Sequence, residues 1–317
     1  MKFNKNIKRL SSMASALMVF SMITLSCSKD DDKQMETTGT ISAMVSMNKD
    51  YSILASAVTK AGLGETLSST GPFTVFAPNN AAFESSGMTS ADISSMSAES
   101  LKSVLLYHTL SAKVVASSVP AGPNAEVKTA NGSNVYVTKN SKGVFVNGWA
   151  VTSPDMMATN GVIHGISHVL MPATKNIVEL ATANSDLSFL VAAVLRASQG
   201  TTNVAQLLSG SGPYTVFAPT NQAFINAGFN TIASINQADP AVLTKILTYH
   251  VLSARAFSSD LSDGQMLSTL NGEKITVKLS GKAMLKGKSN TSEATITGVN
   301  MLATNGVVHV IDQVLLP

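Results

Sequence analysis

Residues 71–83, GPFTVFAPNNAAF, recur at residues 212–224 as GPYTVFAPTNQAF, with ten of thirteen positions identical. In each copy a Gly-Pro turn precedes a short run of β-forming residues, and an Ala-Pro pair closes that run. Asn79 or Thr220 then suits a helix N-cap, because its side-chain oxygen can accept hydrogen bonds from the free amides of the first turn. The stretch therefore predicts a strand, a tight corner and a helix, with the final phenylalanine as a core anchor.

A second repeated block closes each copy. Residues 156–172, MMATNGVIHGISHVLMP, align with residues 301–317, and eleven of the seventeen positions are identical. Because both blocks occur in the same order twice, we predict two domains, at residues 41–172 and 173–317. The junction between them is too short for a flexible linker, so a fixed pair is favoured over two independent domains.

Between the two blocks the pattern changes from helix to strand. Residues 98–108 and 239–250 carry apolar side chains at helical spacing, and both segments end in a Tyr-His pair. Turn pairs such as Asn147-Gly148 then separate runs of β-formers, which indicates antiparallel hairpins. Each copy is therefore predicted to belong to the α+β class.

The charge of the chain is concentrated at its N-terminus. The formal net charge is +3, but four basic residues lie within residues 1–9, before an apolar and hydroxyl run at residues 10–25. This order is typical of a secretory signal, and sixteen residues are too few for a comfortable membrane span of about twenty. Removal of a signal at residues 1–26 leaves 22 − 4 = 18 basic against 19 acidic side chains. No nucleic-acid partner is therefore predicted.

The only cysteine, Cys27, stands where the apolar run ends and is followed by Ser-Lys-Asp-Asp-Asp. This arrangement resembles a bacterial lipoprotein signal, in which the cysteine becomes the lipidated first residue. We predict that Cys27 is lipidated, that residues 27–40 form an acidic tether, and that the protein is anchored in the cell outer membrane and exposed at the surface. The alternative is an ordinary cleaved signal with an incidental cysteine.

Three landmarks occur in order in both copies: the TVFAP block, the Tyr-His helix end, and the ATNGV block that leads to a histidine and a Leu-x-Pro end. Together they resemble the fasciclin, or FAS1, family over nearly the whole chain after the signal. The resemblance implies a β-sandwich or wedge of strands flanked by helices. It also implies an adhesion or interaction module without a general catalytic activity.

In animal matrix relatives, a short acidic motif just before the ATNGV block is implicated in receptor binding. The resemblance therefore implies candidate contact residues at Asp155, Met156 and Met157 of the first copy. Asn300 takes the place of the acid in the second copy and is also a candidate contact residue, but a charge-dependent contact is expected only from the first copy. The methionines are either soft contact residues or core filler, and core is favoured for at least one because Met301 repeats the first.

The Tyr-His helix ends are also linked to adhesion in the family. Their counterparts here are Tyr107, His108, Tyr249 and His250. A histidine at a helix C-terminus can also bond the free carbonyls there, so a role in closing the helix is the alternative to direct contact. Both interpretations stay open at the level of sequence.

The histidines invite a metal-site hypothesis, which the spacing disfavours. His164 and His168 lie in a predicted strand, where at about 3.3 Å per residue they stand roughly 13 Å apart, too far to share a zinc ion. His309 repeats His164, whereas Gln313 replaces His168, so a structural histidine is favoured. The sequence also lacks a Gly-x-Ser-x-Gly elbow. We therefore predict no catalytic site, no bound metal and no cofactor.

These observations predict a surface-anchored, non-enzymatic adhesion protein. Its partner is expected to be a protein or polysaccharide at the cell surface, and its membrane attachment to run through Cys27. The rival hypothesis is an accessory protein that binds envelope carbohydrate or another small ligand in a groove. A hydrolase is a third, weaker alternative.

Overall fold

The computed structural model describes residues 39–317. The predicted signal peptide and Cys27 lie outside these residues. No helix in the described part of the chain combines the length and the hydrophobicity needed to cross a bilayer. We call the elements from α1 to β7 the first domain and those from α7 to β14 the second.

The first domain is built from a layer of helices and a sheet. Its helical segments are α1 (Ile41–Met47), η1 (Lys49–Tyr51), α2 (Ser52–Lys60), α3 (Gly64–Ser68), α4 (Asn80–Ser85), α5 (Ser90–Ser95), α6 (Ala98–Tyr107) and η2 (Ala116–Ser118). Its strands are β1 (Phe73–Pro78), β2 (Thr109–Leu110), β3 (Gly122–Lys128), β4 (Asn134–Asn140), β5 (Gly143–Val146), β6 (Trp149–Ala158) and β7 (Gly161–Ile166).

The second domain repeats this order. Its helical segments are α7 (Ile177–Thr182), η3 (Ser185–Leu187), α8 (Ser188–Ala197), α9 (Val204–Ser209), α10 (Asn221–Asn226), α11 (Ile232–Gln237), α12 (Pro240–Tyr249) and η4 (Ser258–Asp260). Its strands are β8 (Tyr214–Pro219), β9 (Val251–Leu252), β10 (Met266–Ser268), β11 (Lys274–Lys278), β12 (Met284–Lys286), β13 (Ala294–Ala303) and β14 (Gly306–Ile311).

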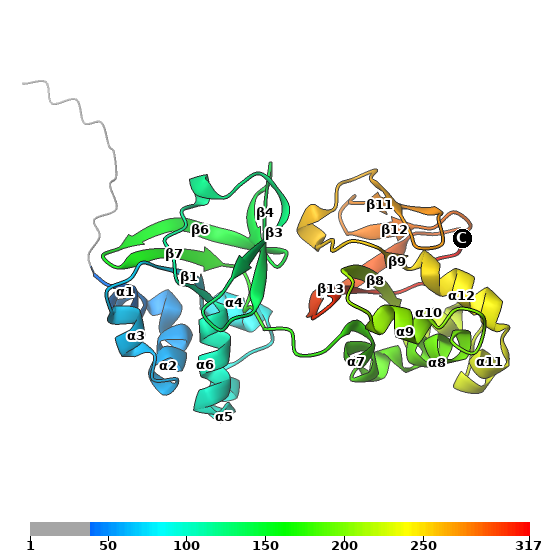
Figure 1. Ribbon diagram of the computed structural model, residues 1–317, viewed down its shortest axis with the longest axis horizontal. Helices are drawn as coiled ribbons and strands as arrows, with labels where there is room; N and C mark the ends of the chain where they lie inside the picture. Colours follow the sequence, from blue (N-terminus) through cyan, green and yellow to red (C-terminus); the bar gives the residue numbers. More distant parts are fainter. Residues whose placement is uncertain (1–38) are drawn as a thin grey trace, which may run out of the picture. The chain divides into compact units, whose positions relative to one another are not determined.

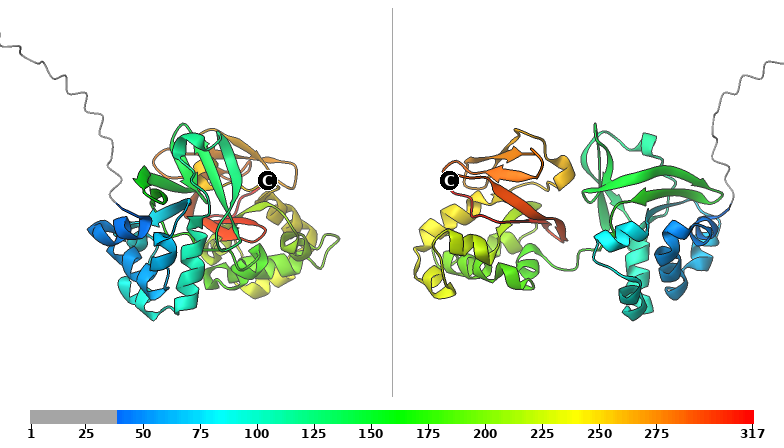
Figure 2. Two further views of the ribbon diagram at one scale, coloured as in Figure 1. Left: turned by 60° about the vertical axis from the view of Figure 1, so that its left-hand side comes forward. Right: turned by 180° about the vertical axis from the view of Figure 1, so that it is seen from behind.

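Each domain contains one curled sheet of seven strands, in the orders β2-β1-β7-β6-β5-β4-β3 and β10-β11-β12-β13-β14-β8-β9. The pairs β1–β7 and β8–β14 are parallel, and the remaining pairs are antiparallel. Within each domain the helices gather on one side of the sheet (Figures 1 and 2). This architecture confirms the predicted α+β class.

The repeated stretch folds as its residues predict. Asn79 accepts a hydrogen bond from Ala82 N at 2.8 Å, and Thr220 accepts one from Ala223 N at 3.2 Å, so both act as N-caps. The phenylalanine that ends each stretch is buried in the core. The predicted hairpin turn at Asn147-Gly148 is also confirmed, because it joins β5 to β6 in antiparallel register.

Asn160, in the ATNGV block, fixes the start of the first domain to its sheet. Its Oδ1 accepts a hydrogen bond from Ile41 N at 2.9 Å, and its Nδ2 donates to the carbonyls of Leu67 and Ser69, both at 2.8 Å. Asn305 makes the same three bonds in the second domain. One amide side chain thus caps the start of the first helix and the end of the third, and it gives hydrogen-bond partners to backbone groups that the helices themselves leave unpaired.

The glycine after this asparagine permits the close approach of the parallel strands. A Cβ atom at Gly161 would overlap the carbonyl oxygen of Phe73 in β1, and Gly306 stands in the same way against Tyr214 in β8. Only glycine leaves room for the neighbouring backbone at these positions.

Hydrogen bonds also join the two domains around Asp260 of η4. Its carboxylate accepts from Asn124 Nδ2 at 3.1 Å and from Thr138 Oγ1 at 2.8 Å. The guanidinium carbon of Arg255 lies 3.8 Å from the ring centroid of Tyr136, which is cation–π geometry. The contacts around Asp260 are therefore polar and aromatic, and Leu302 of β13 adds an apolar contact with the core of the first domain.

We expect Gly161→Ala to lower the free energy of unfolding by about 1–3 kcal/mol, because the added methyl group forces β1 and β7 apart. The matched control is Gly64→Ala, which adds a methyl group in open space at the start of α3. That change should leave stability unchanged or slightly raised. Urea denaturation measures both, and equal stability of the two variants would contradict the close-approach argument.

Candidate functional site

Tyr107 ties the end of α6 to the sheet. The residue is fully buried, its hydroxyl donates to the carbonyl of Asn134 at 2.9 Å, and it accepts from Asn147 Nδ2 at 2.9 Å. Asn147 Oδ1 in turn accepts from Tyr136 N at 2.8 Å. Burial raises the pKa of Tyr107 to about 12, so the hydroxyl keeps its proton and can donate.

Tyr249 does the same in the second domain with different partners. Its hydroxyl donates to the carbonyl of Lys274 at 2.8 Å and accepts from Lys288 N at 3.0 Å. A backbone amide thus replaces the asparagine side chain of the first domain, and the link between helix and sheet is kept.

His108 joins the same helix end to the last residues of the domain. Its Nδ1 lies 2.8 Å from the carbonyl of Val104, and its Nε2 accepts from Leu170 N at 2.9 Å. His250 repeats both contacts in the second domain, at 2.8 and 2.9 Å. Since Nε2 accepts, the proton lies on Nδ1 and the ring is neutral. Burial lowers the pKa of both histidines to about 4.

This geometry decides between the two interpretations of the helix ends. The four side chains are at most 2% exposed, and each is hydrogen-bonded within its own domain. Their burial argues against direct contact with a partner, which corrects their choice as contact candidates. They close the helix onto the sheet.

Asp155 occupies a bulge in β6. Its backbone has φ 58°, in the left-handed region, and the register of β6 against β7 shifts between Ser153 and Met156, on either side of it. Its Oδ1 accepts from Ala116 N at 2.9 Å, and its own amide donates to His164 Nδ1 at 3.1 Å. Because the side chain remains 35% exposed, this carboxylate is open to solvent although it is also hydrogen-bonded to the backbone of η2.

A lysine holds the segment that Asp155 caps. Lys139 Nζ donates to the carbonyls of Ala116, Ser117 and Val119 at 3.0, 3.3 and 3.1 Å. The η2 turn is therefore fixed from both ends, and the carboxylate is presented from a rigid position.

Asn300 is the second-domain counterpart of Asp155. It has φ 59°, its Oδ1 accepts from Ser258 N at 2.9 Å, and its amide lies 3.4 Å from His309 Nδ1. A side-chain oxygen at this bulge is common to both domains, but a negative charge is not. Asn300 is only 6% exposed, which corrects its choice as a contact residue.

The two methionines beside Asp155 differ in role. Met156 packs against the core of the first domain, as Met301 does in the second, which confirms the prediction of a core role for one of the pair. Met157 is half-buried in β6. Thr152, Ser153 and Pro154 are exposed on the same strand, so they and Asp155 form the accessible part of the bulge.

The histidines predicted to be structural are hydrogen-bonded in the core. His164 Nε2 lies 2.8 Å from the carbonyl of Val114, and His309 Nε2 lies 2.9 Å from that of Ala256. The predicted strand β7 ends at Ile166, so His168 lies beyond it and stacks on Trp149 with ring centroids 3.8 Å apart. Within residues 39–317, no three His, Cys, Asp or Glu side chains gather as metal ligands.

Sequence reasoning missed Ala116 and Lys139. Neither lies in a repeated motif, and their roles depend on contacts between η2 and the strands β4 and β6, which are distant in sequence. It also missed Asn160 as a clamp, although its presence in both copies of the ATNGV block was the available signal.

The family model of the fasciclin domain matches residues 49–172 and 186–317. Transforming growth factor-beta-induced protein ig-h3 of Sus scrofa is 33% identical over 251 residues, which cover 78% of this chain and 35% of that protein. Protein sll1483 of Synechocystis is 39% identical over 153 residues, covering 48% of this chain and 79% of that protein. The chain thus spans about a third of the length of ig-h3.

Among solved structures, a FAS1 domain pair from the insect cell adhesion molecule fasciclin I is similar to this chain. The TM-score is 0.41 at 19% sequence identity, and the match covers 87% of this chain and 96% of that one.

We expect Asp155→Asn to change the free energy of unfolding by less than about 0.5 kcal/mol, because an amide oxygen can still accept from Ala116 N, just as Asn300 accepts from Ser258 N in the second domain. Asp155→Ala removes the acceptor and places alanine in the left-handed region, so it should cost about 1–3 kcal/mol. Thermal and urea unfolding of both variants measure the difference. If the asparagine variant lost as much stability as the alanine variant, the charge itself would be structural.

We also expect the melting temperature to fall between pH 6.5 and pH 4. The folded-state pKa of His108, His250 and His309 is about 4, below the ordinary value of 6.5, so the unfolded chain binds protons more readily. Their contribution is therefore complete above pH 6.5 and lost as the pH falls toward 4, at about 3 kcal/mol each.

Calorimetric scans across this pH range test the expectation. The matched control is His168→Gln, which introduces the residue that the second domain has at position 313, and it should keep most of the fall. A melting temperature that stays constant from pH 6.5 to pH 4 would contradict the assignment of neutral buried rings.

Proposed function

Because the chain belongs to the fasciclin family, we propose that it is a non-enzymatic adhesion protein whose first domain contacts its partner through the bulge at Asp155. Many proteins of this family act in cell adhesion or interaction. The second domain, in this proposal, supports the first and does not make the same charged contact.

One observation carries the proposal: Asp155 combines a fixed position with an accessible charge. Its Oδ1 is engaged by Ala116 N, and among the described residues Oδ2 has no hydrogen-bond partner. A carboxylate held in this way loses little side-chain entropy when it binds a cation or a donor, which favours recognition. Asn300 offers neither the charge nor the exposure.

The expected partner is a protein or polysaccharide at a cell surface that presents cationic or hydrogen-bond-donating groups. A single charged contact is weak, so adhesion would depend on many copies held together. The predicted lipid anchor on Cys27 supports such an arrangement, because anchoring in the outer membrane raises the effective concentration of the bulge.

We expect Asp155→Asn to reduce retention of cells or polymer-coated beads by a densely immobilised layer of the protein. Loss of one charge-assisted hydrogen bond, worth about 1.5–3 kcal/mol, corresponds to a reduction in affinity of roughly tenfold or more. Retention by the unaltered protein should also weaken as the salt concentration rises.

The matched control is Glu84→Gln, which removes the same charge from an exposed site on α4. It should leave retention unchanged. Equal retention by the Asp155→Asn variant and the unaltered protein would overturn the assignment of the bulge, and no retention by the unaltered protein on any surface would count against adhesion itself.

A further inference from the structure

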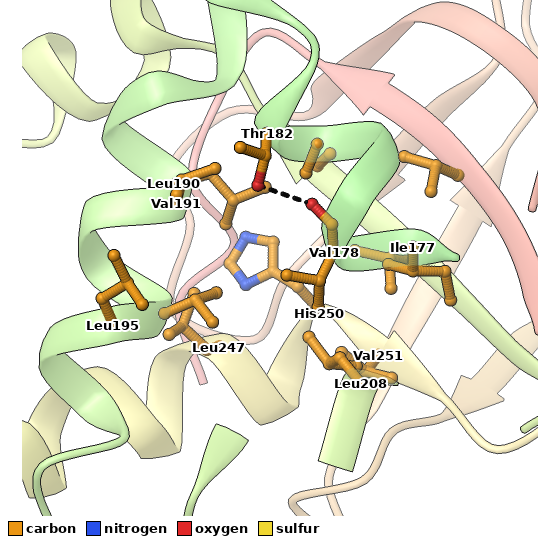
Figure 3. A pocket seen from close by; sticks show the side chains of 15 residues that line it. Ile177, Val178, Thr182, Leu190, Val191, Leu195, Leu208, Leu247, His250 and Val251 are labelled. Atoms are coloured by element: carbon orange, nitrogen blue, oxygen red, sulfur yellow. Dashed lines mark hydrogen bonds between the residues drawn. The ribbon is translucent and has the colours of Figure 1, made fainter. Parts of the chain in front are cut away.

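A cavity of about 300 Å³ lies in the second domain, between α7, α8 and α12 on one side and β8 and β14 on the other (Figure 3). We infer that this cavity binds the end of a straight hydrocarbon chain, as found in a fatty acid or a long-chain alcohol. The inference concerns a different site from the bulge in the first domain and does not depend on it.

Thirteen of the fifteen side chains that line the cavity are aliphatic. Val216 and Val308 of the sheet are buried and form the inner end. The mouth lies between α7 and α8, where Val178 and Val191 are half-buried and Leu195 is 57% exposed. An exposed leucine beside an apolar opening extends the hydrophobic surface toward solvent, which a ligand could cover.

The polar groups in the lining are already satisfied. Thr182 Oγ1 donates to the carbonyl of Val178 at 2.8 Å, as the dashed line in Figure 3 marks. Both ring nitrogens of His250 are hydrogen-bonded, to the carbonyl of Ile246 and from Leu315 N. Within the described part of the chain no charged side chain lines the cavity. A polar ligand group would therefore lose its hydration without gaining a partner, which selects against carbohydrate.

The volume sets the length of the chain. The cavity of about 300 Å³ lies at the lower end of the range for small-ligand pockets, so a short alkyl chain such as one of ten carbons suits it. A hydroxyl or carboxylate at the end of such a chain would stay at the mouth, in solvent.

In the first domain, larger side chains occupy the positions equivalent to two residues that line the cavity. The two domains can be aligned on the bonds from Asn160 to Ile41 and from Asn305 to Ile177, which makes Val45 the counterpart of Ala181. The parallel strand pairs align in the same way, which makes Ile163 the counterpart of Val308. Both counterparts are larger and buried.

The mouth differs between the domains as well. Thr59 stands in the first domain where Leu195 stands in the second, and Ser42 where Val178 stands. The second domain therefore has a smaller inner lining and a more apolar mouth, and both changes favour an apolar guest.

Calorimetric titration of the purified protein with decanol and with decanoate, each below its micelle concentration, tests the inference. We expect saturable binding of both with similar affinity, because the shared chain is what the cavity contacts. Ala181→Val with Val308→Ile, which introduces the side chains of the first domain, should weaken binding at least tenfold. Leu195→Thr, an exposed change that leaves the core intact, should weaken it severalfold.

Ile163→Val is the matched control, since it alters the equivalent buried position of the first domain and should leave binding unchanged. Melting curves establish that each variant is folded. The inference is overturned if neither compound binds saturably, if only decanoate binds, or if folded Leu195→Thr and Ala181→Val/Val308→Ile variants bind as the unaltered protein does.

Discussion

The parallel pairing of β1 with β7, repeated by β8 with β14, is the contact on which each domain depends. It brings the first strand of the domain against the last, and Gly161 or Gly306 allows the backbones to meet. Asn160 or Asn305 then fastens the first helix and the end of the third to the same place. Loss of this pairing would separate the helical layer from the rest of the sheet.

Because this pairing fixes the backbone of each domain, the side chains at other positions can differ between the two domains. The bulge requires only a side-chain oxygen, so Asp155 and Asn300 serve equally well in the fold while only one carries a charge. The space under the first helix accepts Val45 in one domain and Ala181 in the other, and a cavity accompanies the smaller residue. Two domains of the same architecture can thus offer different chemistry.

Local features of the fold were predictable from sequence, and distant pairings were not. Asn79, Thr220 and the Asn147-Gly148 turn act through neighbours within a few residues, and the structure confirms each. The parallel partner of β1 lies far along the chain and has no local signature. For the site, the position of Asp155 followed from the family motif, whereas the burial of the Tyr-His pairs depends on contacts that no single segment encodes.

We propose that the bulge at Asp155 contacts the partner, whereas the Tyr-His helix ends hold the fold. Hydrogen exchange of the protein, free and bound to a retaining surface, tests this most directly. Binding should slow exchange at residues 152–157 and in η2, and leave the end of α6 unchanged. Slowed exchange at the helix ends, with no change at the bulge, would contradict the account.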